Sequence, residues 1–228
     1  MMRILGNKVK ILFFLVLFIS TAKAQVIDSV FMNMPEKICP LLNQSIKFEM
    51  LEYFKAGQSD SVRNRLNGYS SIVLRDSMTK TIDFRASNSS DYQLKMFYVS
   101  ENSYLVGLIR TVNSPILSSN IYFYDENWSP IEVSFVMPKI SDWIDLDLLK
   151  KSNVDSLWLK KVDESEYFGM KFKRDNILEV TNNSLEILNK EDRKLVRSLL
   201  TEGNDSAINM NYQVKVSHDK IMIESIKK

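Results

Sequence analysis

Residues 91–136 read DYQLKMFYVSENSYLVGLIRTVNSPILSSNIYFYDENWSPIEVSFV, and this stretch decides the fold class. It holds four segments rich in aromatic and β-branched residues: YQLKMFYV, SYLVGLIRTV, NIYFYD and IEVSFV. Ser, Asn, Asp and Pro separate them, which is typical of antiparallel strands joined by short turns. Partial alternation of apolar residues predicts that one face of these strands is buried and the other is wetter.

The chain before this stretch predicts one helix and one hairpin. Residues 25–33 are expected to form a short extended lead-in. Asn43 or Ser45 caps a predicted helix through Ala56, which Gly57 ends. We expect residues 59–66 to add one or two further helical turns before the turn signal Asn67-Gly68. A hairpin with its tip at residues 76–79 follows.

Beyond Pro138 the pattern mixes helices and strands. Short helices are predicted after Ser141 and over residues 154–160, and strands over residues 167–173 and 177–182. Asn189 caps an amphipathic helix predicted to reach Thr201, and a hairpin over residues 207–226 closes the chain. We therefore expect an α+β fold, mainly an antiparallel β-sheet meander, with an N-terminal helix and a late amphipathic helix packed on it. Residues 25–228 are expected to form a single domain, with a subdomain boundary, if any, near residue 138.

Residues 1–24 have the pattern of a signal peptide. Three basic residues precede the unbroken apolar run ILFFLVLFI at residues 11–19. Ala22-Lys23-Ala24 then supplies small residues for cleavage between Ala24 and Gln25. The run is shorter than the roughly 20 apolar residues of a membrane-spanning helix. We therefore predict an exported protein, periplasmic or secreted, with no stable membrane span after cleavage.

The charge of the chain argues against nucleic acid as a partner. The leader holds four of the 30 basic residues and no acidic one, so cleavage leaves 26 basic against 28 acidic residues, a formal charge of −2. A nucleic-acid-binding domain normally carries a basic excess. Tyr98, Tyr104 and the segment Tyr122-Phe123-Tyr124 superficially suggest a base-stacking platform, but core aromatics are the favoured interpretation.

Several segments resemble one family. They are FMNMP at residues 31–35, CPLL at 39–42, LEYFKAG at 51–57, IYFY at 121–124 with Trp128, and LNKED at 188–192. Together they resemble a family of exported Bacteroidales proteins catalogued only as a domain of unknown function. The chain departs from that pattern at Gln44-Ser45-Ile46, where the family is more polar and basic. The resemblance implies a bacterial exported protein and carries over no catalytic residue.

The inventory of reactive side chains favours no catalytic, cofactor-binding or metal-binding residue. One His and one Cys cannot form a Cys/His zinc site, and no phosphate-binding glycine motif is present. His218 is expected at an exposed hairpin tip, where a general base would lack a pocket. Cys39 lies in an apolar run and is predicted to be a buried structural thiol. The acidic residues Asp142, Asp145 and Asp147 are expected on a solvated helix face.

Five Asp-Ser pairs are each followed by an apolar residue, where composition alone predicts about one. The serines are Ser29, Ser61, Ser77, Ser156 and Ser206. These tripeptides resemble the acceptor motif by which exported Bacteroidales proteins are O-glycosylated. The alternative is structural, because Asp and Ser are common in turns and helix caps.

Three functions stay open. The favoured one is a non-enzymatic binding or interaction module of the cell envelope, whose sheet or sheet edges bind a protein or glycan partner. It rests partly on Tyr104 and Trp128, which are expected to face solvent at strand turns. The alternative is a hydrolase of envelope polymers that uses a carboxylate pair, which no spacing singles out. The third is a structural subunit of a larger assembly.

Overall fold

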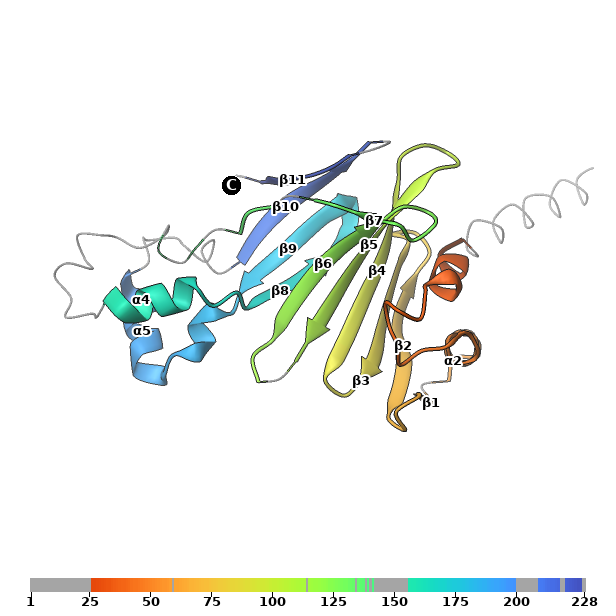
Figure 1. Cartoon of the computed structure of the whole chain (residues 1–228), viewed down its shortest axis with the longest axis horizontal. Helices are drawn as coiled ribbons and strands as arrows, with labels where there is room; N and C mark the ends of the chain where they lie inside the picture. The colour runs from red at the N-terminus through yellow and green to blue at the C-terminus, as the bar shows by residue number, and fades with distance from the viewer. Residues whose placement is uncertain are drawn as a thin grey trace, which may run out of the picture. The chain divides into compact units, whose positions relative to one another are not determined.

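The computed structural model describes residues 26–58, 60–113, 115–133, 135–137, 139, 141, 156–199, 209–217 and 220–226, with the backbone alone for 156–159. Two antiparallel sheets and a few helices make up the fold (Figure 1). One sheet has seven strands in the order β1-β2-β3-β4-β5-β6-β7, and the other has four in the order β11-β10-β9-β8. Consecutive strands are neighbours throughout the larger sheet, so the predicted α+β meander is confirmed. Among the described residues, no helix is long and apolar enough to cross a membrane.

The chain forms two compact units, one up to Ala86 and one from Ser87 onward. The first begins with a helix over residues 26–33, so the expected extended lead-in is wrong. Ile27, Val30, Phe31 and Met34 are all buried. Their i, i+3, i+4, i+7 spacing places them on one helical face. Burial of that face explains why the segment folds as a helix.

The predicted helix follows as α2 (Gln44–Lys55), with both ends fixed by sequence. The Asn43 side chain accepts a hydrogen bond of 2.9 Å from the N–H of Ile46. At the other end, Gly57 has φ +68° and donates to Phe54, while Gln58 donates to Tyr53. This pair of hydrogen bonds is a Schellman motif, in which glycine adopts the left-handed conformation without a steric penalty.

A short strand, β1 (Val62–Arg63), replaces the helical turns expected over residues 59–66. It pairs with the start of β2 (Tyr69–Asp76), since Val62 faces Ser70. Between the two strands, the buried Asn64 side chain accepts hydrogen bonds from Leu66 and Gly68 and donates to Ala86. These bonds stabilise the predicted Asn67-Gly68 turn. The backbone of residues 62 and 63 pairs with β2 instead of forming helical turns. The hairpin of β2 and β3 (Thr81–Ser87) is as predicted.

The second unit contains the stretch that decides the fold. Its strands are β4 (Ser90–Tyr98), β5 (Tyr104–Val112), β6 (Ser118–Tyr124) and β7 (Pro130–Ile131). The first three confirm the prediction, but the fourth is much shorter than expected. Val133 and Phe135 keep the apolar alternation and pack against the core of this unit, with the Phe135 ring 5.0 Å from that of Tyr212. The alternation therefore indicates packing there, without a strand ladder.

The rest of the second unit follows the predicted order. Its elements are α4 (Ser156–Asp163), β8 (Phe168–Phe172), η2 (Arg174–Asn176), β9 (Ile177–Asn182), η3 (Ser184–Ile187), α5 (Lys190–Leu199), β10 (Asn209–Val216) and β11 (Ile221–Ser225). Asn189 caps α5 as predicted by accepting from the N–H groups of Glu191 and Asp192. The helix predicted after Ser141, the end of the α5 helix at Thr201 and the hairpin tip at His218 lie outside the described residues.

An aromatic cluster occupies the core of the second unit. The ring centroids of Phe97 and Phe172 are 5.2 Å apart, and Phe123 lies 6.1 and 6.2 Å from them. Gly107 lies under these rings, because a Cβ atom there would be 2.7 Å from both Phe97 and Phe172. Residues 92–97 of β4 are buried without interruption, so the wetter face predicted for this strand is wrong.

Candidate binding surface

Four tyrosines lie on one face at one end of β4, β5 and β6, and we call Tyr98, Tyr104, Tyr122 and Tyr124 the tyrosine surface. In the register of the sheet, Tyr98 faces Tyr104 directly. Tyr124 and Tyr122 face positions 106 and 108 of β5. Because side chains two positions apart share a face, all four rings project to the same side. Tyr98 is 44% exposed and Tyr122 is 42% exposed, while the other two are half-buried.

The rings of the tyrosine surface contact one another and their neighbours. The Tyr98 and Tyr104 centroids are 6.5 Å apart in an edge-to-face arrangement. Burial raises the pKa of Tyr104, and the nearby charge of Glu126 and the Tyr98 ring add to this effect. Burial also raises the pKa of Tyr124, with a further contribution from Tyr122. The Tyr104 and Tyr124 hydroxyls therefore stay neutral at physiological pH and can both donate and accept hydrogen bonds.

Two polar turns border the tyrosine surface. Residues 99–103 connect β4 to β5, and residues 125–129 connect β6 to β7, so both turns lie at the same end of the sheet (Figure 1). Their exposed side chains are those of Glu101, Asn102, Glu126 and Asn127, together with small serines. Amides and carboxylates of this kind accept hydrogen bonds from a ligand, and the carboxylates favour cationic groups.

Trp128 corrects the sequence prediction, since it is buried rather than solvent-facing, with an exposed fraction of 5%. Its ring centroid is 5.3 Å from that of Tyr124. Its backbone has φ +62°, a left-handed conformation that is unusual for a bulky residue. Asp125 holds the turn by accepting hydrogen bonds from the N–H groups of Asn127 and Ser129. Packing of the Trp128 indole against Tyr124 offsets the strain of this conformation. The indole also supports the Tyr124 ring of the tyrosine surface from the side of the turn.

A pocket of about 130 Å³ lies beside β7. Tyr122 and Tyr124 belong to its wall, but their rings project from the opposite face of β6 to Ile121 and Phe123, so the pocket and the tyrosine surface lie on different faces of the sheet. Its other lining residues are apolar: Ile121, Phe123, Pro130, Ile131, Val133, Phe135 and Ile223. Among the described residues, no carboxylate, imidazole or thiol lines this pocket, so its lining suits an apolar group.

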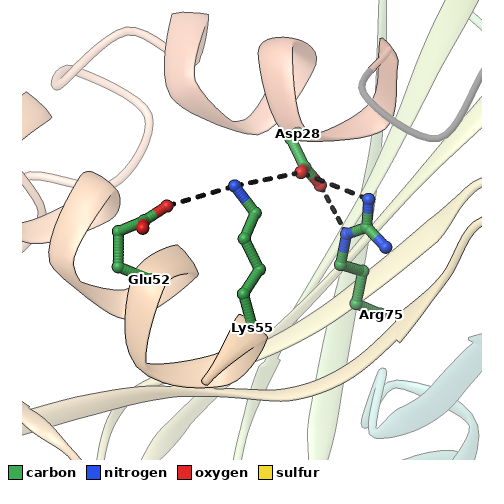
Figure 2. A network of polar contacts seen from close by, with 4 residues as sticks. All are labelled: Asp28, Glu52, Lys55 and Arg75. Atoms are coloured by element: carbon green, nitrogen blue, oxygen red, sulfur yellow. Dashed lines mark hydrogen bonds and ion pairs between the residues drawn. The ribbon is translucent and has the colours of Figure 1, made fainter. Parts of the chain in front are cut away.

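The polar network around Asp28 ties the first unit together (Figure 2). Asp28 accepts hydrogen bonds from Arg75 at 2.6 and 3.2 Å. Lys55 lies 3.7 Å from Asp28 and 3.2 Å from Glu52. The network joins the helix over residues 26–33 to α2 and β2. Each charged group faces an opposite charge, so removal of one partner would leave another charge partly buried without its counter-charge.

Few of the side chains considered for chemistry lie in the described part of the chain. Cys39 is buried, as predicted. Within the described part of the chain, no group of three or more His, Cys, Asp or Glu residues could hold a metal ion. His218, the acidic residues Asp142, Asp145 and Asp147, and the predicted cleavage site at Ala24 and Gln25 lie outside the described residues, so those predictions stay predictions.

The five serines of the Asp-Ser tripeptides do not form one site. Ser29 is exposed on the helix over residues 26–33, and Ser61 is exposed just before β1. Ser77 is half-buried at the β2–β3 hairpin tip, where the Asp76 side chain accepts a hydrogen bond from the N–H of Met78. Ser156 begins α4, and Ser206 lies outside the described residues. Both Asp28 and Asp76 have structural roles that account for part of the repeated pattern, and the predicted O-glycosylation stays a prediction.

Sequence reasoning assigned these aromatics to the core and missed the tyrosine surface. That assignment is right for Phe123, which is buried, and wrong for Tyr98 and Tyr122, which are exposed. The segment Tyr122-Phe123-Tyr124 did contain a signal for the tyrosine surface. Alternating positions of a strand project to opposite faces, so phenylalanine marks the core face and tyrosine the other.

Comparisons with known proteins agree with the resemblance found in the sequence. Residues 19–205 match a family described as "Protein of unknown function (DUF3256)". The structure titled "Structure of a domain of an uncharacterized protein from Porphyromonas gingivalis W83" has a similar fold, with a TM-score of 0.67 and 17% sequence identity. The similarity covers 86% of this chain and 96% of that chain. No curated protein matches the chain. The predicted resemblance is confirmed, while export stays a prediction.

Proposed function

Because the chain belongs to this family of unknown function, we propose from its own surface that it is a non-enzymatic binding module whose tyrosine surface engages a partner. The observation that carries the proposal is the gathering of four tyrosines on one face, two of them more than 40% exposed. Tyrosine supplies a large contact area and a hydroxyl at a low cost in conformational entropy. It is accordingly enriched among the residues that dominate binding energy.

The setting of the tyrosine surface supports the proposal. The surface lies on a rigid sheet, and the buried Trp128 braces it, so the rings are held in position before a partner arrives. Preorganised rings lose little entropy on binding. The apolar run and the small residues at the N-terminus suggest export, so we extend the proposal to a protein or glycan partner in the periplasm or outside the cell.

The hydrolase alternative receives less support. A glycosidase needs two carboxyl groups about 5–10 Å apart on either side of the scissile bond. In the described part of the chain, the pocket beside β7 has no carboxylate in its lining, and the network around Asp28 places its carboxylates against cations. We therefore favour binding.

The proposal is tested by removing the two exposed rings. The Tyr98→Ala/Tyr122→Ala variant should lose binding to glycan arrays or displayed peptide libraries that the parent protein recognises. Tyr69→Ala is the matched control, because Tyr69 is also exposed but lies on β2 of the first unit. Equal binding by the parent and the double variant would show that the tyrosine surface is not the binding site.

A further inference from the structure

β11 is an edge strand of the four-stranded sheet, and β10 is the one described strand that pairs with it (Figure 1). The hydrogen bonds of β11 fix which of its backbone groups face β10. The N–H of Ile226 donates to the carbonyl of Asn211 at 2.9 Å, so the even-numbered residues of this segment bond to β10. The odd-numbered residues direct their N–H and C=O groups away from β10, and these residues are Ile221, Ile223 and Ser225.

Other open edges of the two sheets are protected. The backbone of β8, at the far edge of the same sheet, bonds to side chains, since Ser119 accepts from the N–H of Met170. In the larger sheet β2 extends beyond β1, but its register shifts between Ile72 and Leu74. A bulge of this kind hinders the addition of a further strand. Within the described part of the chain, β11 has a regular register over its five residues and shows neither form of protection.

A second copy of β11 is complementary to this edge. The two strands can run antiparallel about a twofold axis that passes through the sheet at Ile223. Ile223 then faces its counterpart and Ile221 faces Ser225 of the second copy, so each outward N–H and C=O group gains a partner. Ile223 is half-buried and packs against the core of the second unit. Its counterpart would lie on the same face of the sheet and cover it further.

The exposed charges of the strand also match in this arrangement. Within the sheet, Lys215 lies opposite Met222 and reaches diagonally to Glu224, with 2.7 Å between the charged groups. Across the axis, Glu224 has Lys220 of the second copy as a diagonal neighbour, and both side chains are exposed. The right-handed twist of a sheet favours this diagonal over the one that joins the two Glu224 side chains. The symmetry makes the Lys220–Glu224 contact twice.

We propose that two copies of the chain associate by antiparallel pairing of their β11 strands, which joins their four-stranded sheets into one. The inference goes beyond the proposed function, because β11 and the tyrosine surface belong to different sheets. An interface centred on one short strand is small, so we expect a reversible dimer rather than a permanent one.

Sedimentation velocity of the purified protein over a range of concentrations tests the inference. The parent protein should change from monomer to dimer as the concentration rises. Ser225→Pro should raise the dimer dissociation constant at least about tenfold, because proline removes an outward N–H and leaves the ladder with β10 intact. Ser225→Ala is the matched control, since it keeps this N–H and should dimerise as the parent does.

Charge reversal tests the register of the two strands. Lys220→Glu and Glu224→Lys should each raise the dissociation constant about tenfold, because like charges then meet at both symmetry-related contacts. An equal mixture of the two variants should recover dimerisation, since a mixed pair has opposite charges at both contacts. Failure of the mixture to recover would overturn the proposed pairing, because no other register predicts this compensation.

Hydrogen exchange gives a second readout. The N–H groups of Ile223 and Ser225 should become protected as the dimer forms, whereas those of Met222 and Glu224 should be protected in both states. A parent protein that stays monomeric, or a dimer that Ser225→Pro leaves unchanged, overturns the inference. Protection of the outward N–H groups only when another protein is added would assign the edge to that protein and overturn self-pairing.

Circular dichroism and thermal unfolding check that Ser225→Pro is folded. If it is not, the charge variants and the exchange rates of the parent protein decide, because exposed charge reversals leave the core unchanged. The tyrosine variants used to test the proposed function should dimerise as the parent does, so the two proposals can fail separately.

Discussion

The side chain of Gln93, on β4, accepts a hydrogen bond of 2.5 Å from the backbone N–H of Phe172, on β8. β8 is an edge strand of the four-stranded sheet, so one row of its backbone groups has no strand partner there. Polar side chains of the larger sheet take that place. Ser119 accepts from the N–H of Met170 at 3.1 Å, and Lys95 donates to the carbonyl of Lys173 at 2.9 Å. These contacts explain why β4 and β6 carry buried polar residues.

Replacing Gln93 by Leu should destabilise the protein by about 1–3 kcal/mol, because the N–H of Phe172 would be buried without an acceptor. Urea denaturation measures the free energy of unfolding. Asn120→Leu serves as control, since Asn120 is exposed on β6 and its replacement should change stability by less than about 0.5 kcal/mol. Equal effects of the two substitutions would contradict the role of Gln93.

Gly107→Ala should destabilise the protein by about 1–3 kcal/mol, because the new Cβ would collide with the rings of Phe97 and Phe172. The ring proton shifts of these phenylalanines should change as the rings move apart. Gly57→Ala provides the comparison, because it strains the backbone at φ +68° without meeting any atom within 4 Å. Its cost should be about 1 kcal/mol, and the ring signals should stay in place.

A double-mutant cycle on Asp28 and Arg75 should give a coupling energy of about 1.5–3 kcal/mol, because these side chains are only 10% and 18% exposed. Glu36 and Arg65 form an ion pair of the same 2.6 Å length with both side chains about half exposed. That pair should couple by less than about 1 kcal/mol. Similar coupling in the two cycles would show that burial does not strengthen the Asp28 network.

The stability contributed by Lys47 should depend on pH. Its ammonium group is buried on α2 and donates at 2.5 and 2.6 Å to the carbonyls of Met32 and Met34, at the end of the preceding helix. Burial lowers the pKa of Lys47 below its ordinary value of 10.5, against the opposing effects of Glu36 and Cys39.

At pH values between the lowered pKa of Lys47 in the folded protein and 10.5, the Lys47 side chain therefore binds more protons in the unfolded chain than in the folded protein. Stability must then rise with pH in that window. The free energy of unfolding of the parent protein, relative to Lys47→Met, should increase as the pH approaches 10.5. The raised tyrosine pKa values affect both proteins alike and cancel in the difference. Parallel pH curves would contradict the burial of a charged Lys47.

For the Asp-Ser tripeptides, the structure ranks the serines by accessibility. If they are O-glycosylated, Ser29 and Ser61 should be modified most, because they are exposed, and Ser77 less, because it is half-buried. The intact mass of protein from its native host should then exceed that of the polypeptide, and Ser29→Ala should remove part of the excess. A mass equal to that of the bare polypeptide would contradict the prediction of O-glycosylation.

Local signals in the sequence predicted the elements well. Asn43 and Asn189 start helices, Gly57 ends one, and Asn67-Gly68 forms a turn, because each of these residues acts on backbone groups within a few positions. The helix over residues 26–33 was also accessible, since Ile27, Val30, Phe31 and Met34 have helical spacing. The prediction of an extended segment after the predicted signal peptide is wrong because this spacing buries one face of a helix.

Contacts between distant segments were beyond prediction. Nothing near Gln93 in the sequence indicates that its side chain replaces a strand partner for Phe172, 79 positions away. The pocket could not be predicted from sequence for the same reason, since Ile223 of β11 lines it together with residues of β6 and β7. The strand predicted to include Val133 and Phe135 is too long for a related reason. An apolar period of two indicates which side chains are buried and not whether the backbone is paired with another strand.

The buried indole of Trp128 gives the tyrosine surface an optical reporter. A ring held 5.3 Å from Tyr124 and shielded from water should emit at short wavelength and accept excitation energy from the neighbouring tyrosines. The chain has two other tryptophans, Trp143 and Trp158. Replacing both by Phe would leave one emitter beside the surface, so that a ligand settling on the tyrosines would change the colour and intensity of its light.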